Sequence, residues 1–251
     1  MLLSMHGNPD FASESVVAYE TGYRIKPHRR FSVDIAVFYN RYSDASGVQV
    51  QTPYRSSTPP PLHMVLPGEF VNGVGATSYG LESFFHWQVN RFWKLTWNHA
   101  YLKVKTVPDP GVVNMQQTTQ SPTHQLQFRS EYSLPHGFQF GMSARYVSSL
   151  PGASILQPFV ATVTAVGIPI NPLALSNSTS SPDFLTQPYV QSHVRCDLRL
   201  AWDPRTNMRL EVVGQDLLSP RHPESNETDG LVFSAISQPS RNVFAKLTWR
   251  F

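Results

Sequence analysis

The sequence predicts an all-β protein whose strands form an antiparallel, up-and-down transmembrane β-barrel. Three observations predict this fold: strand-length alternation of apolar and polar residues recurs along the chain, short and long connections alternate strictly, and aromatic residues follow the apolar register. The mean hydropathy is -0.25 and no apolar run approaches the roughly 18 residues of a membrane helix. Helical membrane spans are therefore excluded, whereas barrel strands leave no such hydropathy signal.

The alternation occurs in about nine segments. Successive side chains of an extended strand point to opposite faces, so alternation gives each segment one apolar and one mostly polar face. A membrane barrel strand turns the first face to lipid and the second to the lumen. The segments are residues 17–25, 31–39, 79–89, 93–101, 126–132, 138–146, 190–202, 208–212 and 241–251. The polar faces carry Glu82, Arg129, Glu131, Arg195, Asp197 and Arg199. We expect these charges to have a structural role, either in cross-strand pairs or against a domain inside the barrel.

The connections between the segments alternate in length, as they do in membrane barrels with short turns at one rim and long loops at the other. The short turns are 26–30, 90–92, 133–137 and 203–207, and the long connections are 42–75, 104–121, 147–188 and 216–240. The long ones hold most of the 21 prolines. Structureless loops of this length are uncommon in a compact soluble domain, so they favour a barrel rim.

Aromatic residues lie on the apolar register, many of them near strand ends, where amphipathic rings prefer the lipid headgroup level. They are Tyr19, Tyr23, Tyr39, Trp87, Trp93, Trp97, Tyr101, Tyr132, Tyr146, Trp202 and Trp249. The alternative is that these rings form the core of a large soluble all-β binding domain. The loop asymmetry favours the barrel over that alternative.

Composition points away from other functions. A net charge of +3, with no basic cluster among stacking aromatics, does not suggest nucleic acid as a partner. No glycine-rich phosphate loop, nucleophile elbow or metal-ligand spacing among the nine histidines is present, so we expect neither an enzyme nor a cofactor or metal site. Cys196 is the single cysteine; an intrachain disulfide is excluded, and we expect it to be a lipid-facing or buried small hydrophobe.

The N-terminus suggests that the chain is part of a longer protein. Residues 1–5 are too short for a signal peptide. Nine strands also make an odd number, whereas bacterial single-chain barrels have an even one. We therefore expect residues 1–251 to be the C-terminal portion of a barrel. A truncated, non-functional remnant of such a protein is the alternative that this pattern leaves open.

Several short motifs then show a family resemblance. The segments Gly7 to Phe11 with Glu14, and Tyr19 to Tyr23, resemble the "NPdl.pE....yE.Gy" pattern of TonB-dependent outer-membrane receptors. Further similar motifs follow in the family's order: Phe38-Tyr39-Asn40, Ala76 to Glu82, Asp197 to Leu200, Gly214 to Leu218 with Asp216 in place of the usual Asn, His222 with Glu224, and Arg241 with Trp249-Arg250-Phe251. Each motif is weak alone, but together they span the chain.

The resemblance implies a 22-stranded barrel around an N-terminal plug, located in the outer membrane of a Gram-negative bacterium. This chain would supply about nine C-terminal strands, with the plug and signal peptide absent. Its partners would be outer-membrane lipid, the TonB complex through the missing N-terminal part, the barrel-assembly machinery and a small-molecule ligand. The resemblance implies TonB-energised uptake of a scarce ligand such as a ferric siderophore, cobalamin, haem or a saccharide, and the sequence does not identify which.

Two groups of residues are candidates for function. In the long connections, Tyr54, Arg55, His63, Met64, Phe70, Phe159 and Phe184 could contact an aromatic or anionic ligand, or could simply pack loop against loop. At the C-terminus, Leu247, Trp249 and Phe251 resemble the signal by which the barrel-assembly machinery recognises its substrates. An aromatic anchor on a strand edge suits recognition by strand addition.

Overall fold

The structure is a computed structural model that describes residues 2–114, 121–150, 153–154, 186–187, 189–218, 223–224 and 238–251. The main sheet has twelve strands, and nine of them follow one another in the order β14-β13-β12-β9-β8-β6-β5-β3-β2. They are β2 (Ser15–His28), β3 (Phe31–Val50), β5 (His63–Gln88), β6 (Trp93–Pro108), β8 (His124–Ser133), β9 (Phe138–Val147), β12 (His193–Arg205), β13 (Met208–Gln215) and β14 (Asn242–Trp249). The nine predicted strands are confirmed.

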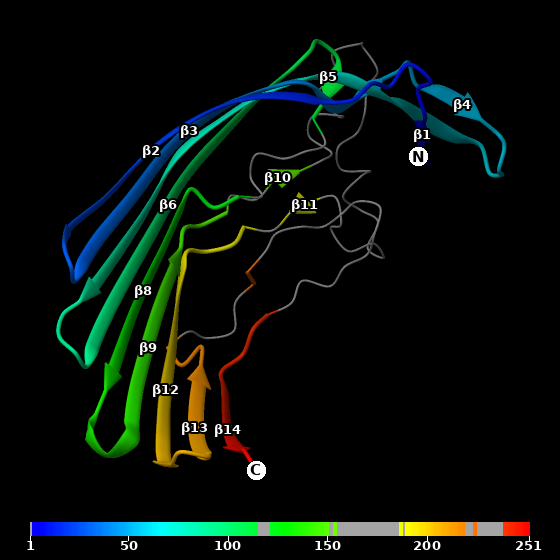
Figure 1. The fold of residues 1–251 in the computed structure, drawn as a ribbon. Helices are drawn as coiled ribbons and strands as arrows, with labels where there is room; N and C mark the ends of the chain where they lie inside the picture. The colour runs from blue at the N-terminus through cyan, green and yellow to red at the C-terminus, as the bar shows by residue number, and fades with distance from the viewer. Residues whose placement is uncertain are drawn as a thin grey trace.

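Every neighbouring pair along this path is antiparallel, and the sheet curves without closing among the described residues (Figure 1). Strands β2 and β14 form its two edges. Because pairing directions alternate across nine strands, both edges run towards the same rim. An antiparallel barrel that contains this sheet therefore places an odd number of further strands between β14 and β2.

Short turns lie together at one rim of the sheet, the lower one in Figure 1. They fall where the sequence predicts them: β2 and β3 meet at Arg29 and Arg30, and β12 and β13 meet at Thr206 and Asn207. The turn between β8 and β9 contains the short helix η1 (Pro135–Gly137). The chain ends at this rim too, where Arg250 N donates a hydrogen bond to Asn207 O over 2.9 Å.

The opposite rim corrects one expectation. The connection 42–75 is not an irregular loop: β3 continues to Val50 and β5 begins at His63, so the two strands form a long hairpin beyond the end of β2 (Figure 1). Three short strands join this hairpin, namely β1 (Leu2–His6), β4 (Tyr54–Ser56) and β7 (Val112–Val113). The strands persist because apolar side chains on the hairpin bury one another there. Most of the connections 147–188 and 216–240 lies outside the described residues, apart from the paired strands β10 (Ala153–Ser154) and β11 (Thr186–Gln187).

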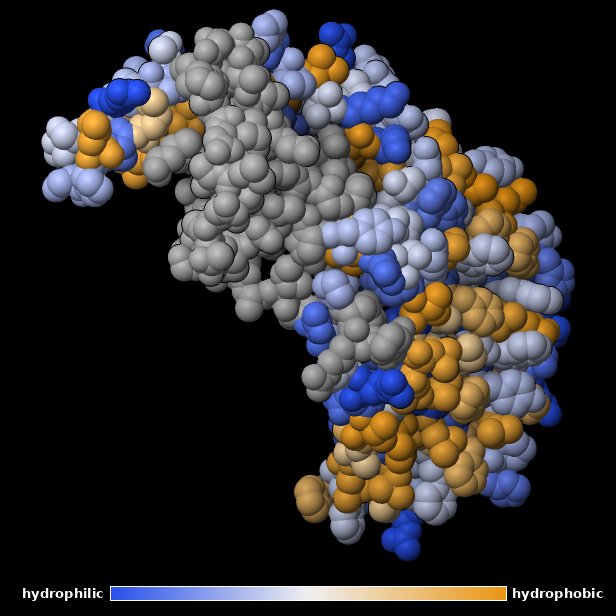
Figure 2. Space-filling model, turned by 180° about the vertical axis from the view of Figure 1, so that it is seen from behind, coloured by the Kyte–Doolittle hydropathy of each residue, from blue (hydrophilic) through white to orange (hydrophobic). Residues whose placement is uncertain are grey.

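The predicted apolar register is exposed. Tyr19 is 63% exposed, Trp97 52% and Leu200 48%, and no second layer covers them among the described residues. In Figure 2, apolar side chains gather over the lower part of the molecule, towards the short turns, and above them apolar and hydrophilic side chains are mixed. A soluble sandwich would bury these rings, so the structure favours the lipid-facing interpretation. No helix among the described residues has the length and apolar character of a membrane span.

Candidate functional site

The upper hairpin has its own small core. Val48, Leu66 and Val113 are buried to 0%, 3% and 2% exposure, and Met5, Val50 and Phe70 pack against them. These residues come from β1, β3, β5 and β7, which are distant in sequence. Phe70, a candidate either for ligand contact or for packing within the loop, is partly buried and packs against this core.

Two chain segments cross the root of the hairpin. Residues 108–113 lead from β6 to the far edge of β3, where Val113 pairs with Val48. The crossing is close: a Cβ on Gly47 would lie 2.5 Å from a Val112 methyl, and one on Gly73 would lie 2.8 Å from the other. Glycine is required at both positions because any side chain would push the crossing segment away.

The second crossing segment lies just before β2 and includes Ala12 and Glu14. Asn72 of β5 joins it to the hairpin. Its Nδ2 donates to the carbonyl oxygens of Ala12 (3.0 Å) and Asp44 (2.7 Å), and its Oδ1 accepts from Ala12 N (2.7 Å). Ser46 N also donates to Glu14 Oε1 over 2.8 Å. Glu14 belongs to the motif that begins at Gly7, and it lies directly before the first residue of β2. That motif therefore ties the start of β2 to the hairpin.

Replacing Asn72 by alanine is expected to loosen the hairpin. Three hydrogen bonds would be lost, at about 0.5–1.5 kcal/mol each, and local opening would become easier. Amide hydrogen exchange of residues 44–50 and 66–72 should accelerate by roughly tenfold or more. Asn90→Ala, the same substitution in a turn at the opposite rim, should leave this exchange unchanged. Equal acceleration in both variants would show that Asn72 has no special role.

The tip of the hairpin holds four of the candidate ligand residues. Tyr54 and Arg55 lie on β4, both exposed, and Arg55 pairs across the strands with Met64. His63 faces the same side as Tyr54; its Nδ1 donates to Pro61 O over 2.8 Å. Its Nε2 is buried without a hydrogen-bond partner in the part of the chain that the structure describes. The tip thus exposes the Tyr54 phenol on one face of β4 and the Arg55 guanidinium on the other. Phe159 and Phe184 lie outside the described residues.

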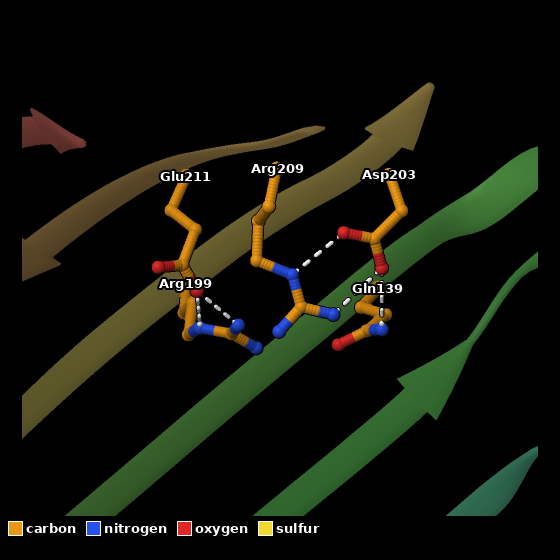
Figure 3. A network of polar contacts seen from close by, with 5 residues as sticks. All are labelled: Gln139, Arg199, Asp203, Arg209 and Glu211. Atoms are coloured by element: carbon orange, nitrogen blue, oxygen red, sulfur yellow. Dashed lines mark hydrogen bonds and ion pairs between the residues drawn. The ribbon is translucent and has the colours of Figure 1, made fainter. Parts of the chain in front are cut away.

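The polar face of the sheet carries cross-strand ion pairs, as expected for the lumen register. Near the short turns, Arg209 donates to both carboxylate oxygens of Asp203 at 2.6 Å, and Gln139 donates to Asp203 at 3.2 Å (Figure 3). Arg199 pairs diagonally with Glu211 in the same network. Similar pairs join Lys94 with Glu131 and Arg24 with Asp34. These contacts are partly solvent-exposed, so they fix strand register more than they add stability.

A polar hollow of about 590 Å³ lies higher on this face, lined by residues of five strands, β3, β5, β6, β8 and β9. Its lining includes Asp34, Glu82, Asn98, Gln127 and Arg145, so acidic, amide and basic groups are mixed. Such a surface suits water or a polar protein segment inside a barrel. Among the described residues, no three His, Cys, Asp or Glu side chains cluster as metal ligands.

Two motif residues meet at the upper end of β13: Asp197 of β12 and Asp216, which follows the last residue of β13. Asp216 adopts a left-handed conformation with φ of 53°, which Asn and Asp tolerate better than other residues, and its backbone N donates to Asp197 Oδ1 over 2.8 Å. Its own carboxylate is buried, and neither oxygen has a hydrogen-bond partner among the residues described. Cys196 beside this contact is buried and free, as the sequence predicts.

The C-terminal strand β14 pairs with β13 along its length, and the Trp249 and Phe251 rings stack with centroids 5.9 Å apart. Leu247 and Trp249 are 56% and 57% exposed on the outward register. The three residues are therefore available at the sheet edge. Their role as an assembly signal stays a prediction.

A curved antiparallel sheet with an apolar outer face, a charged inner face and short turns at one rim defines the membrane β-barrel class. The family "TonB dependent receptor-like, beta-barrel" matches residues 4–217. The chain belongs to this family, whose members are receptors and transporters of the outer membrane.

Solved structures show the same fold. The ferric enterobactin receptor PfeA from Pseudomonas aeruginosa, in a mutant form, has a TM-score of 0.65 and 14% identity, with 98% of this chain and 32% of that one covered. The siderophore receptor PirA from Acinetobacter baumannii has a TM-score of 0.64 and 15% identity, with 98% of this chain and 33% of that one covered. The copper transporter OprC has a TM-score of 0.60 and 14% identity, with 97% of this chain and 33% of that one covered. The chain thus spans about a third of the length of these structures, and the search of curated proteins gave no match.

Proposed function

We propose that this chain forms the C-terminal part of an outer-membrane receptor that takes up a scarce ligand with energy supplied through TonB. The observation that carries the proposal is the nine-stranded sheet itself, with lipid-type residues outside and ion pairs inside, in a chain of this family. The plug and the TonB-contacting segment would come from the rest of the receptor. The polar hollow beside Asp34 and Glu82 would face that plug.

Among the ligand classes, a ferric siderophore is the first choice. Of the structures similar to this chain, PirA is a siderophore receptor and PfeA is a ferric enterobactin receptor. The exposed tip of the hairpin supports the choice, because the Arg55 guanidinium can pair with an anionic complex and Tyr54 can stack on an aromatic one. Cobalamin, haem and a saccharide are the alternatives, and the test below distinguishes them.

The test is uptake by cells that produce the receptor containing this chain. Cells are given radiolabelled ferric siderophores, cobalamin, haem and an oligosaccharide, with and without an uncoupler that collapses the proton gradient. We expect uptake of one ligand class that the uncoupler abolishes. The double variant Tyr54→Ala, Arg55→Ala should reduce the ligand's affinity about tenfold, which corresponds to about 1.4 kcal/mol.

Arg29→Ala, at the opposite rim, is the matched control and should bind normally. A correctly folded barrel that takes up none of the ligands would contradict the proposal and favour a non-transporting remnant. Uptake that the uncoupler does not affect would contradict the energy source.

A further inference from the structure

On strand β3 the outward face changes from apolar to basic between Tyr39 and Arg41. In β3 the outward residues are apolar or aromatic from Phe31 to Tyr39, a rise of about 27 Å, close to the roughly 25 Å apolar band of membrane barrels. At the top of this stretch Tyr19, Tyr39 and Tyr79 pair side by side across β2, β3 and β5. The Tyr19 and Tyr39 ring centroids are 6.5 Å apart. A row of amphipathic rings such as this is typical of the headgroup level in membrane barrels.

Basic residues lie directly above the tyrosine row. The next outward row contains Val17, Arg41, Thr77 and Lys105, which are cross-strand neighbours on β2, β3, β5 and β6. Its members on β3 and β6 are basic, and Val17 on β2 is apolar. The Lys105 ammonium lies 5.9 Å from the centre of the Tyr79 ring, and Lys103 is the cross-strand partner of Tyr79. Arg41, Lys103 and Lys105 are exposed, and within the described chain none of them forms an ion pair.

The same row borders a hollow of about 340 Å³ on this face. Arg41, Thr77 and Lys105 line the hollow. Gly75 also lines it and has no side chain to fill the space. Val107, which is 71% exposed, forms an apolar part of the lining. Two carboxylates, Asp44 and Asp109, also line the hollow, but they lie farther from the tyrosine row: Asp109 N bonds Gly73 O, beyond Gly75.

We propose that this hollow binds the phosphorylated headgroup of an outer-leaflet lipid. The proposal rests on the proposed membrane location of the barrel. Arg41 and Lys105 flank Thr77, so their strands are about 10 Å apart and both cations can reach one phosphate between them. Asp44 and Asp109 restrict an anion to the lower end of the hollow, next to the tyrosines.

The position identifies the occupant as a lipid. The hollow opens on the outward face, away from the polar lumen face, and the apolar surface immediately below it can accept acyl chains. A soluble anion would gain only the two cations, whereas a phosphorylated lipid gains the cations and the apolar surface together. Cations placed next to a row of aromatic rings are the arrangement expected where a barrel contacts lipid headgroups.

The test uses the receptor containing this chain, extracted from outer membranes in detergent. Lipopolysaccharide with phosphorylated lipid A is titrated against the wild type and against the double variant Arg41→Gln, Lys105→Gln, and bound lipid is counted by native mass spectrometry. We expect about tenfold weaker binding by the variant. The double variant Arg29→Gln, Arg91→Gln removes the same charge at the opposite rim and should bind like the wild type.

Dephosphorylated lipid A provides the second comparison, and it should bind the wild type about as weakly as the phosphorylated form binds the variant. Equal binding by both double variants, or by both lipids, would overturn the proposal. Resistance of the barrel to unfolding in SDS is measured in parallel. If no SDS-resistant barrel is recovered from the outer membrane, the proposed location itself fails; a stable barrel that ignores the phosphate refutes only the lipid site.

Discussion

Replacing Ile35 by arginine is expected to lower the free energy of unfolding of the barrel in lipid by about 2–4 kcal/mol. Ile35 lies on the outward register of β3, midway between Phe31 and Tyr39. A guanidinium there would lie near the middle of the apolar band, where neither water nor a carboxylate can solvate it. The measurement is urea unfolding of the receptor reconstituted in phospholipid vesicles, followed by tryptophan fluorescence.

The matched control is the next residue of the same strand, Ala36. It faces the opposite way and lines the polar hollow together with Asp34 and Glu82. Arginine at this position would find carboxylates nearby, so Ala36→Arg should cost well under half as much as Ile35→Arg. If the two substitutions had equal effects, the assignment of the outward and lumen faces would be wrong.

Replacing Gly80 by alanine is expected to hinder assembly of the sheet between β5 and β6. A Cβ at this position would lie 2.1 Å from the Tyr101 carbonyl oxygen and 2.6 Å from the Phe38 ring. Neither the backbone of β6 nor the ring packed over the glycine can move without disturbing the ladder. We expect a loss of about 1–3 kcal/mol or more, seen as a smaller fraction of SDS-resistant barrel in outer membranes.

Gly75→Ala, five residues earlier on the same strand, is the control. A Cβ there would meet only the Val107 carbonyl oxygen, at 3.6 Å, which is an ordinary contact. The assembled fraction should therefore match that of the wild type. Equal loss in both variants would mean that β5 tolerates no side chain for a reason other than the close approach at Gly80.

The same glycine shows how sequence and structure complement each other. Phe38 and Gly80 belong to two separate motifs of the family resemblance, and the sequence gives no reason for either residue type. In the structure they are cross-strand partners, and the ring covers the glycine. The link between Asp197 and Asp216 is of the same kind. A motif can thus be noticed in the sequence, but its physical cause depends on the strand register.

The upper hairpin could not be predicted from alternation. Residues 42–75 are rich in Pro, Ser and Gly, so they were predicted to be a loop, yet β3 and β5 continue through most of them. What stabilises these strands is burial of Val48 and Leu66 against Val113, a residue 65 positions beyond Val48 in the numbering of the chain. A contact of that separation leaves no local signal. For this reason Phe70 packs against a small core, whereas Tyr54 and Arg55 remain exposed.

By itself the sequence determined the class of fold, the nine strands, the rim with short turns and the apolar face of each strand. It could do so because a two-residue period and turn residues are local properties of a chain. Only the tertiary structure decided which residues meet: the hairpin and its crossing segments, the ion pairs near Asp203, and the row that joins Arg41 to Lys105. These depend on register between strands, which brings side chains together across a sheet regardless of their distance along the sequence.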